Sequence, residues 1–211
     1  TLYSEWNRIF GDVYGDKETD FTAIRASLFS LYRIDDNKVD IRYVLFTIQT
    51  YYNIILKLLV FDLLSSLGDP TFVSSRNYRK VELYQLFIGK DINSNKIRNF
   101  FEVQFFEWFL YADNFNITII QESLVALDSI EATASIIKPE IVEDVFREVY
   151  NGLMPKPVRH LLGEYYTPGW LVEFVLDKAN YSGDIDCTLL DPACGSGSFV
   201  THAIKRYYAK N

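Results

Sequence analysis

The sequence predicts a mainly α protein, in which a helical N-terminal domain is followed by a single β-α unit. Apolar residues recur at three- and four-residue steps over most of the first 150 residues, which is the spacing of helices packed on a core. Near the C-terminus the pattern changes to a short apolar run, a glycine-containing segment and one more helical stretch. Hydrophobic residues make up 49% and charged residues 23% of the 211 residues, so the chain can bury a sizeable core.

Periodicity supports each predicted helix of the N-terminal domain. The expected helices cover residues 4–14, 21–33, 40–67, 78–88, 94–111 and 139–152. Segment 117–137 is ambiguous, because it opens with ITII, which could be a short strand, and continues with helical spacing. The aromatic content of 16% indicates dense helix packing, since no stretch interleaves aromatic residues with Lys and Arg as a base-stacking groove would.

The most membrane-like stretch is residues 53–68. Lys57 and Asp62 interrupt its apolar run, which falls short of the roughly 20 residues that a bilayer core requires. We therefore expect a buried helix here.

Residues 153–167 predict a connector between two domains. They contain two prolines, Gly163 and a basic triplet (Lys156, Arg159 and His160), a composition typical of loops. After the connector, Thr167 is expected to cap a helix and Pro168 to take its first position. The predicted organisation is a helical N-terminal domain over 1–152, a connector over 153–167 and the start of a second domain over 168–211.

The β-α unit begins with CTLLD, residues 187–191, an apolar run of the kind found in buried parallel strands. It is followed by ACGSG and then by a helical stripe that starts at Phe199. Glycines in such a loop let a ligand approach the main chain, and the helix that follows favours a carboxylate or phosphate at its N-terminus.

Three classes of ligand compete for this loop. The phosphate loop of an NTPase needs Gly-Lys-Ser/Thr, but Gly197 is followed by Ser198 and Phe199. A dinucleotide loop needs Gly or Ala where Val200 stands. The loop therefore suits a group smaller than pyrophosphate, with Asp191 at the carboxyl end of the strand as its best candidate binding residue.

Two short motifs carry a specific family resemblance. DPACGSGSF, residues 191–199, resembles the cofactor-binding motif I of adenine-N6-specific DNA methyltransferases of restriction-modification systems, and GEYYTP, residues 163–168, resembles their motif X. The resemblance implies a Rossmann-like methyltransferase domain in which motif I holds the methionine end of S-adenosylmethionine and motif X closes over the same cofactor. The implied cofactor-binding residues are Tyr166, Thr167, Pro168, Asp191, Ala193, Cys194, Gly195, Ser196, Gly197 and Phe199.

Several of these residues also have plainer roles. Tyr166 can simply pack, Cys194 can be a small buried apolar residue, and Thr167 with Pro168 fits a helix start. No residue of the chain is expected to be catalytic. No metal site is expected either, because the two cysteines and two histidines lack the spacing of a zinc site.

The motif order, X directly before I, resembles the subgroup of the family in which the catalytic domain precedes the target recognition domain. A helical domain ahead of the methylase core is similar to type I modification subunits and to fused restriction-modification enzymes. The family turns the target adenine out of DNA and holds it with an Asn/Asp-Pro-Pro-Tyr/Phe motif, which this chain lacks. The acid that would bind the ribose hydroxyls is expected about 20 residues past the loop. We therefore expect the chain to be the N-terminal piece of a longer methyltransferase and to be inactive alone.

The charge and the cysteines bear on partners and location. A net charge of −7 argues against DNA contact by the chain as a whole, so DNA is expected to bind other parts of the full-length protein. A specificity or nuclease subunit or domain is a candidate partner. The two cysteines and the lack of a visible export signal fit a reduced cytoplasmic compartment, and no membrane association is expected.

An alternative function stays open for the helical domain. It could be a coupling or interaction module that joins the methylase core to nuclease or specificity components, which its aromatic content and negative charge permit. Capture of a partner by residues 1–150 alone would favour this alternative.

Overall fold

The structure is a computed structural model, and it describes residues 1–15, 18–35, 38–66, 87, 105–112, 117–128, 147, 149–195 and 197–211. The chain divides into two compact units, Thr1–Thr133 and Ala134–Asn211, which are described separately below. Every regular element among the described residues is a helix, so the prediction of a mainly α protein is confirmed.

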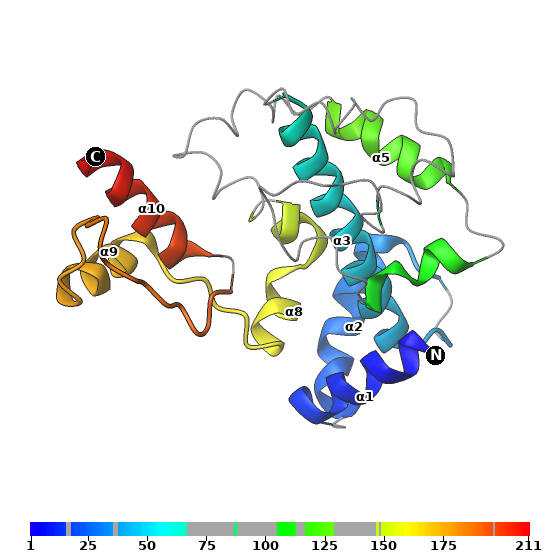
Figure 1. Cartoon of the computed structure of the whole chain (residues 1–211). Helices are drawn as coiled ribbons and strands as arrows, with labels where there is room; N and C mark the ends of the chain where they lie inside the picture. The colour runs from blue at the N-terminus through cyan, green and yellow to red at the C-terminus, as the bar shows by residue number, and fades with distance from the viewer. Residues whose placement is uncertain are drawn as a thin grey trace. The chain divides into compact units, whose positions relative to one another are not determined.

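Unit 1 is built around one long helix (Figure 1). Its described elements are α1 (Leu2–Tyr14), α2 (Glu18–Tyr32), α3 (Ile41–Ser66), the 3-10 helix η2 (Phe105–Tyr111) and α5 (Thr118–Asp128). α3 lies against α1, η2 and α5.

The first three predicted helices of unit 1 are confirmed by α1, α2 and α3. In the described part of the ambiguous segment, α5 (Thr118–Asp128) is a helix that includes most of the ITII sequence, whereas residues 129–137 lie outside the described residues. The predicted helix at 78–88 and the first part of that at 94–111 lie largely outside the described residues.

Aromatic side chains fill the core of unit 1. Trp6 stacks on Phe10 with ring centroids 4.8 Å apart and meets Phe46 of α3 at 5.2 Å. The indole N–H of Trp6 donates to Gln49 Oε1 at 2.9 Å, so its polar edge is satisfied inside the packing. In these helices the aromatic residues therefore serve packing, as the sequence predicts.

A buried ion pair interrupts this apolar core. Lys57 on α3 is 1% exposed and pairs with Glu107 on η2, which is fully buried. Lys57 Nζ also donates to the backbone oxygen of Phe87 at 3.3 Å, whereas Glu107 Oε2 has no hydrogen-bond partner. Lys57, which appears in the sequence only as a break in an apolar run, thus fixes α3 to η2.

By length and composition alone, the Ile41–Val60 part of α3 could cross a membrane, with a mean hydropathy of 1.3. However, 56% of that stretch is buried inside the structure, as in the core helix of a globular protein. This agrees with the expectation of a buried helix.

Unit 2 contains the segments that carry the sequence motifs. Its described helices are α8 (Lys156–Leu161), α9 (Gly169–Lys178) and α10 (Ser198–Lys210). Residues 147 and 149–153 are also helical, in agreement with the end of the predicted helix at 139–152, most of which lies outside the described residues. Met154, Val158 and Val172 are fully buried in it. Because α8 is helical, part of the predicted connector is not a loop.

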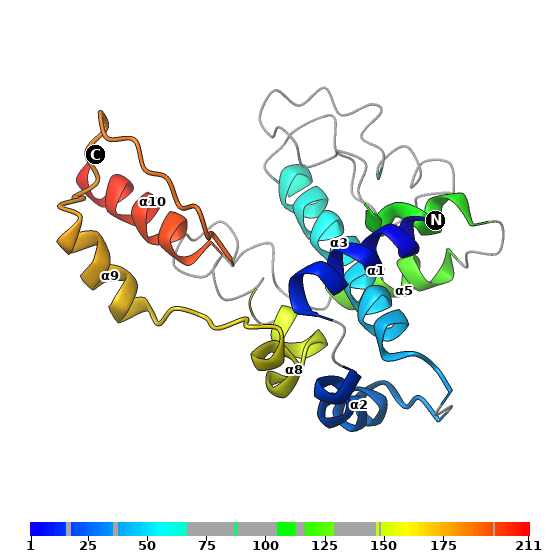
Figure 2. The same cartoon turned by 90° about the horizontal axis from the view of Figure 1, so that it is seen from below.

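α9 and α10 lie side by side and run in the same direction (Figure 2). Gly169 at the start of α9 lies against His202 in the second turn of α10, whereas Asp177 near the end of α9 pairs with Arg206 one turn further along α10. The contacting residues follow one another in the same direction along both helices, so both N-termini lie at the same end of the pair.

The start of α9 differs from the prediction. Pro168 is the N-cap and no side chain caps the helix, so the expectation of Thr167 as N-cap with Pro168 in first position is wrong. The Pro168 carbonyl accepts from the N–H groups of Leu171 and Val172 at 2.9 and 3.1 Å. The helix therefore starts one residue later than proposed.

The predicted strand at 187–191 is not confirmed. These residues form irregular backbone, and Leu190 is 84% exposed. A parallel strand exists only when a neighbouring strand pairs with its N–H and C=O groups. No strand is present among the described residues to supply that pairing.

Candidate cofactor-binding site

The glycine loop, residues 191–197, is the turn that leads into α10. Gly195 and Gly197 have φ values of 55° and 80°, in the left-handed region that favours glycine. The N–H of Gly197 donates to the carbonyl of Cys194 at 2.8 Å, which closes the turn, and Gly197 is the N-cap of α10. A Cβ on Gly197 would meet no atom closer than 4.0 Å, so backbone conformation rather than space requires glycine here. Ser196 lies outside the described residues.

Asp191 is the first residue of the loop, and only one of its two carboxylate oxygens accepts a hydrogen bond. Its Oδ1 accepts from the backbone N–H of Ala193 at 3.1 Å, which fixes the side chain against the loop. Its Oδ2 is buried and has no hydrogen-bond partner. An unsatisfied buried carboxylate oxygen costs free energy, so this atom is a natural place for a ligand to donate a hydrogen bond.

The first turn of α10 provides the complementary chemistry. The first N–H groups of an α-helix have no acceptor within the helix, and the helix dipole places partial positive charge there. Phe199, the second residue of α10, is half-buried, while Ala193, Cys194 and Gly195 of the loop are exposed. The exposed loop therefore brings N–H donors close to one buried, unpaired carboxylate oxygen, which suits a ligand carrying both an ammonium and a carboxylate.

The motif X segment packs its aromatic residues against basic ones. The ring of Tyr166 lies 4.7 Å from the Arg147 guanidinium carbon and 5.2 Å from that of Arg159. Tyr165 stacks on His160 with ring centroids 4.8 Å apart. Tyr166 is thus half-buried as a packing residue, and burial raises the pKa of its hydroxyl.

One residue of the basic triplet is bonded within unit 2, and the other two are exposed to solvent. Arg159 Nε donates to the carbonyl of Met154 at 3.1 Å, so this side chain is tied to its own unit. Lys156 and His160 are exposed. No group of three or more His, Cys, Asp or Glu side chains that could hold a metal ion occurs in the described part of the chain, and both cysteines are free and exposed.

Glu164 is a half-buried acid beside motif X. It accepts a hydrogen bond from the Tyr150 hydroxyl at 2.5 Å. Burial raises the pKa of its carboxyl above the ordinary value of 4.5, and the Tyr150 hydrogen bond and Arg159 only partly oppose this.

We expect Glu164→Gln to change how the stability of unit 2 depends on pH. A carboxyl whose pKa is higher in the folded state holds its proton longer there, so its contribution to the free energy of unfolding falls as the pH rises from 4.5 through the folded pKa. The glutamine variant lacks this loss. Urea unfolding between about pH 4 and pH 7 should show the variant gaining on the wild type as pH rises. Asp186→Asn, at an exposed position, is the control. If the free energy of unfolding depended on pH in the same way for the wild type and for Glu164→Gln, the prediction would be contradicted.

A charged cluster that the sequence motifs do not include joins α9 to α10. Glu173 pairs with His202 and with Arg206, and Arg206 also pairs with Asp177 at 2.8 Å. The hydrogen bond from His202 and the contacts with Arg206 lower the pKa of Glu173, and the same carboxylates raise the pKa of Arg206. One sequence signal could have indicated it: two acids four residues apart on one predicted helix and two bases four residues apart on the next.

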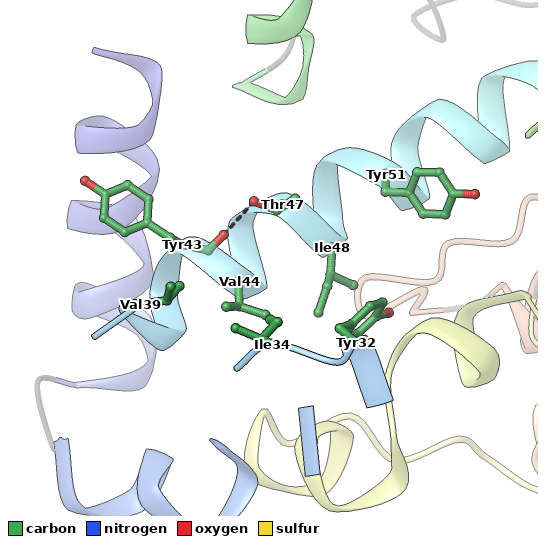
Figure 3. Close-up of a pocket in the computed structure, with 8 residues that line it drawn as sticks. All are labelled: Tyr32, Ile34, Val39, Tyr43, Val44, Thr47, Ile48 and Tyr51. Atoms are coloured by element: carbon green, nitrogen blue, oxygen red, sulfur yellow. Dashed lines mark hydrogen bonds between the residues drawn. The ribbon is translucent and has the colours of Figure 1, made fainter. Parts of the chain in front are cut away.

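Unit 1 has an apolar cavity of about 510 Å³ between the end of α2, the segment after it and the first half of α3 (Figure 3). Its lining residues are Tyr32, Ile34, Val39, Tyr43, Val44, Thr47, Ile48 and Tyr51. Burial raises the pKa of Tyr32 to about 12. The cavity has no charged lining residue, so it suits an apolar group.

Comparison with known proteins identifies the motif-bearing part of the chain. Residues 141–211 match the sequence profile of the family described as N-6 DNA Methylase. A stretch of 72 residues is 33% identical to the type I restriction enzyme MjaIX methylase subunit of Methanocaldococcus jannaschii; it covers 33% of this chain and 12% of that subunit. No solved structure matches the chain. The profile match and the match to a restriction enzyme's methylase subunit together confirm the resemblance that motifs X and I indicate: residues 141–211 are similar to the N-6 DNA methylase family and to the methylase subunit of a type I restriction enzyme.

Proposed function

We propose that the chain is the N-terminal part of an adenine-N6-specific DNA methyltransferase that uses S-adenosylmethionine. The observation that carries the proposal is Asp191, whose Oδ2 is buried and unpaired at the start of a glycine loop within the matched region. A carboxylate at this place and the N–H groups of α10 complement the ammonium and carboxylate of an amino-acid group.

The proposed binding residues divide into two segments. Asp191 would accept from the ammonium of the cofactor. Ala193, Cys194, Gly195, Ser196 and Gly197 would form the loop around its amino-acid end, and the N–H of Phe199 in the first turn of α10 would face its carboxylate. Tyr166, Thr167 and Pro168 lie just before α9, whose N-terminus is at the same end of the helix pair as that of α10. When bound, the cofactor would supply an electrophilic methyl group, and the chain would supply orientation and charge.

A Rossmann-like β-α unit is part of the proposal. Residues 187–191 would become its first parallel strand when neighbouring strands pair with them, and α10 would be the helix that follows. The exposure of Leu190 at 84% and Leu189 at 37% supports this, because neighbouring strands and helices would bury these apolar side chains. The proposed domains are 1–152, a connector over 153–167, and 168–211.

Transfer to adenine requires parts that this chain does not contain. The sequence has no Asn/Asp-Pro-Pro-Tyr/Phe motif, and the stretch matched in the Methanocaldococcus relative is only 12% of that protein. We therefore propose that DNA binding and base flipping belong to other parts of a longer cytoplasmic protein, with a specificity or nuclease subunit or domain as partner.

Substitution of Asp191 tests the cofactor proposal. We expect Asp191→Asn to weaken S-adenosylmethionine binding by roughly tenfold or more, because one charge-assisted hydrogen bond is lost. Titration calorimetry on the intact parent protein measures the affinity. Asp186→Asn, an exposed acid five residues earlier, is the matched control and should bind like the wild type. The proposal would be refuted if the Asp191 variant and the wild type bound the cofactor with equal affinity. It would also be refuted if the folded parent protein did not bind the cofactor.

A further inference from the structure

Arg206 fastens α10 to α9 and to the segment that follows α9. Its Nε donates to the Glu173 carboxylate at 2.9 Å and its Nη2 to the Glu173 backbone oxygen at 3.0 Å. Its Nη1 donates to the Tyr181 backbone oxygen at 2.7 Å. With the pair to Asp177, one guanidinium therefore contacts three residues, and its side chain is only 18% exposed. The planar fork of arginine allows this, and lysine could not reproduce it.

His202 extends the fastening toward the start of α9. Its Nδ1 lies 2.5 Å from Glu173 Oε1. Its ring lies so close to Gly169 that a Cβ there would be 3.4 Å from the ring carbon Cε1. Gly169 follows Pro168 directly, so the imidazole packs on the residue next to motif X.

We infer that Arg206, Glu173 and His202 are positioning residues that hold the end of motif X at a fixed distance from the glycine loop. If this distance is fixed, the affinity for the cofactor depends on it, and that consequence rests on the proposed function. Motif X ends at Pro168, one residue before α9, and the loop ends at Gly197, one residue before α10. Since neither segment belongs to a paired strand in the described residues, the contacts between the two helices set their separation.

A second ion pair between the same helix and its neighbouring segment provides the matched control. Lys210, at the far end of α10, pairs with Asp184, and both side chains are about half exposed, at 44% and 51%. Removing it takes away an α10 charge without touching Gly169, Glu173 or Pro168. Comparing variants of Arg206 with a variant of Lys210 therefore distinguishes a positioning role from the general effect of losing an ion pair on α10.

The experiment compares Arg206→Gln, Arg206→Lys and Glu173→Gln with Lys210→Gln, all in the full chain. In one arm, nitroxide labels at Cys194 and at Trp170→Cys, in a Cys187→Ser background, report the distance between the loop and the start of α9; both labelled positions are exposed. In the other arm, calorimetry of the unlabelled parent protein reports S-adenosylmethionine affinity. Circular dichroism checks that each variant keeps its helices.

We expect a narrow label distance distribution that broadens in the three cluster variants and stays narrow in Lys210→Gln. Affinity should fall by about tenfold in the cluster variants, because misplacing one segment weakens contacts made by both. Unchanged distributions in helical variants would overturn the inference, as would broadened distributions with unchanged affinity. A wild type that binds no cofactor would refute the proposed function instead, and the label distances would still decide whether the cluster fixes the two segments.

Discussion

Alanine in place of Gly183 is expected to cost unit 2 about 3 kcal/mol of stability. Gly183 is buried with φ at 88°, and a Cβ there would lie 2.5 Å from the backbone oxygen of Arg206 and 2.9 Å from the backbone nitrogen of Tyr207. The clash is with the main chain of α10, so no side-chain rotation relieves it. The loop would have to move away from α10, and Arg206 would lose its bond to Tyr181.

Variants of two other glycines distinguish the cost of the backbone conformation from the cost of the clash. Gly163 has φ at 70° but no atom within 4 Å of its Cβ position, so Gly163→Ala reports the conformational cost alone, about 1 kcal/mol. Gly152 lies in a helix with no neighbour within 4 Å, so Gly152→Ala should be neutral or stabilising by up to about 1 kcal/mol. Amide hydrogen exchange in α9 and α10 measures all three. Equal protection in the Gly183 and Gly163 variants would show that the predicted clash is relieved at no cost.

Breaking the buried pair of Lys57 and Glu107 is expected to have the largest effect in unit 1. Lys57→Met leaves the Glu107 carboxylate buried without a counter-charge, which costs about 3–5 kcal/mol. The double variant Lys57→Met with Glu107→Leu removes both charges and should recover much of that loss, because neither charge is then left buried and unpaired. Urea unfolding followed by the fluorescence of Trp6 and Trp108 reports on this unit when Trp170 of α9 is replaced by phenylalanine in every variant.

An exposed ion pair provides the comparison for this prediction. Arg8 and Asp12 pair at 3.0 Å on α1 with side chains 66% and 67% exposed. Arg8→Ala should change the free energy of unfolding by no more than about 0.5 kcal/mol, because water screens such pairs. If Lys57→Met were as mild as Arg8→Ala, the Glu107 carboxylate would have to find water or another donor in the variant. The burial argument would then fail.

The parts of the fold that were predictable from sequence depend on local pattern. α1, α2 and α3 follow from apolar spacing within each segment, because a helix needs only its own residues to form its hydrogen bonds. The strand at 187–191 does not share this property, since its hydrogen bonds would come from other strands. The helix start at Pro168 shows the same limit on a smaller scale, because Thr167 has a capping side chain that α9 does not use.

The candidate site divides in the same way. The turn at Gly195 and Gly197 was predictable, because a tight turn before a helix requires backbone conformations that favour glycine, whereas the binding roles of these glycines and of Asp191 stay predictions. The contacts of Glu173 with His202 and Arg206 join residues 29 and 33 positions apart. No local rule predicts such pairs; only the spacing of the two acidic and two basic side chains on the two helices indicates them. Lys57 was missed for a related reason, since its partner lies 50 positions away.

The parallel course of α9 and α10 has an electrostatic consequence. Each helix contributes roughly half an elementary charge at its N-terminus, so about one unit of positive charge collects beside Pro168 and Gly197 in a chain whose formal total is −7. At physiological ionic strength this local potential fades within about 8 Å. An incoming anion is therefore not drawn from afar; it has to reach the two helix ends by diffusion before they attract it.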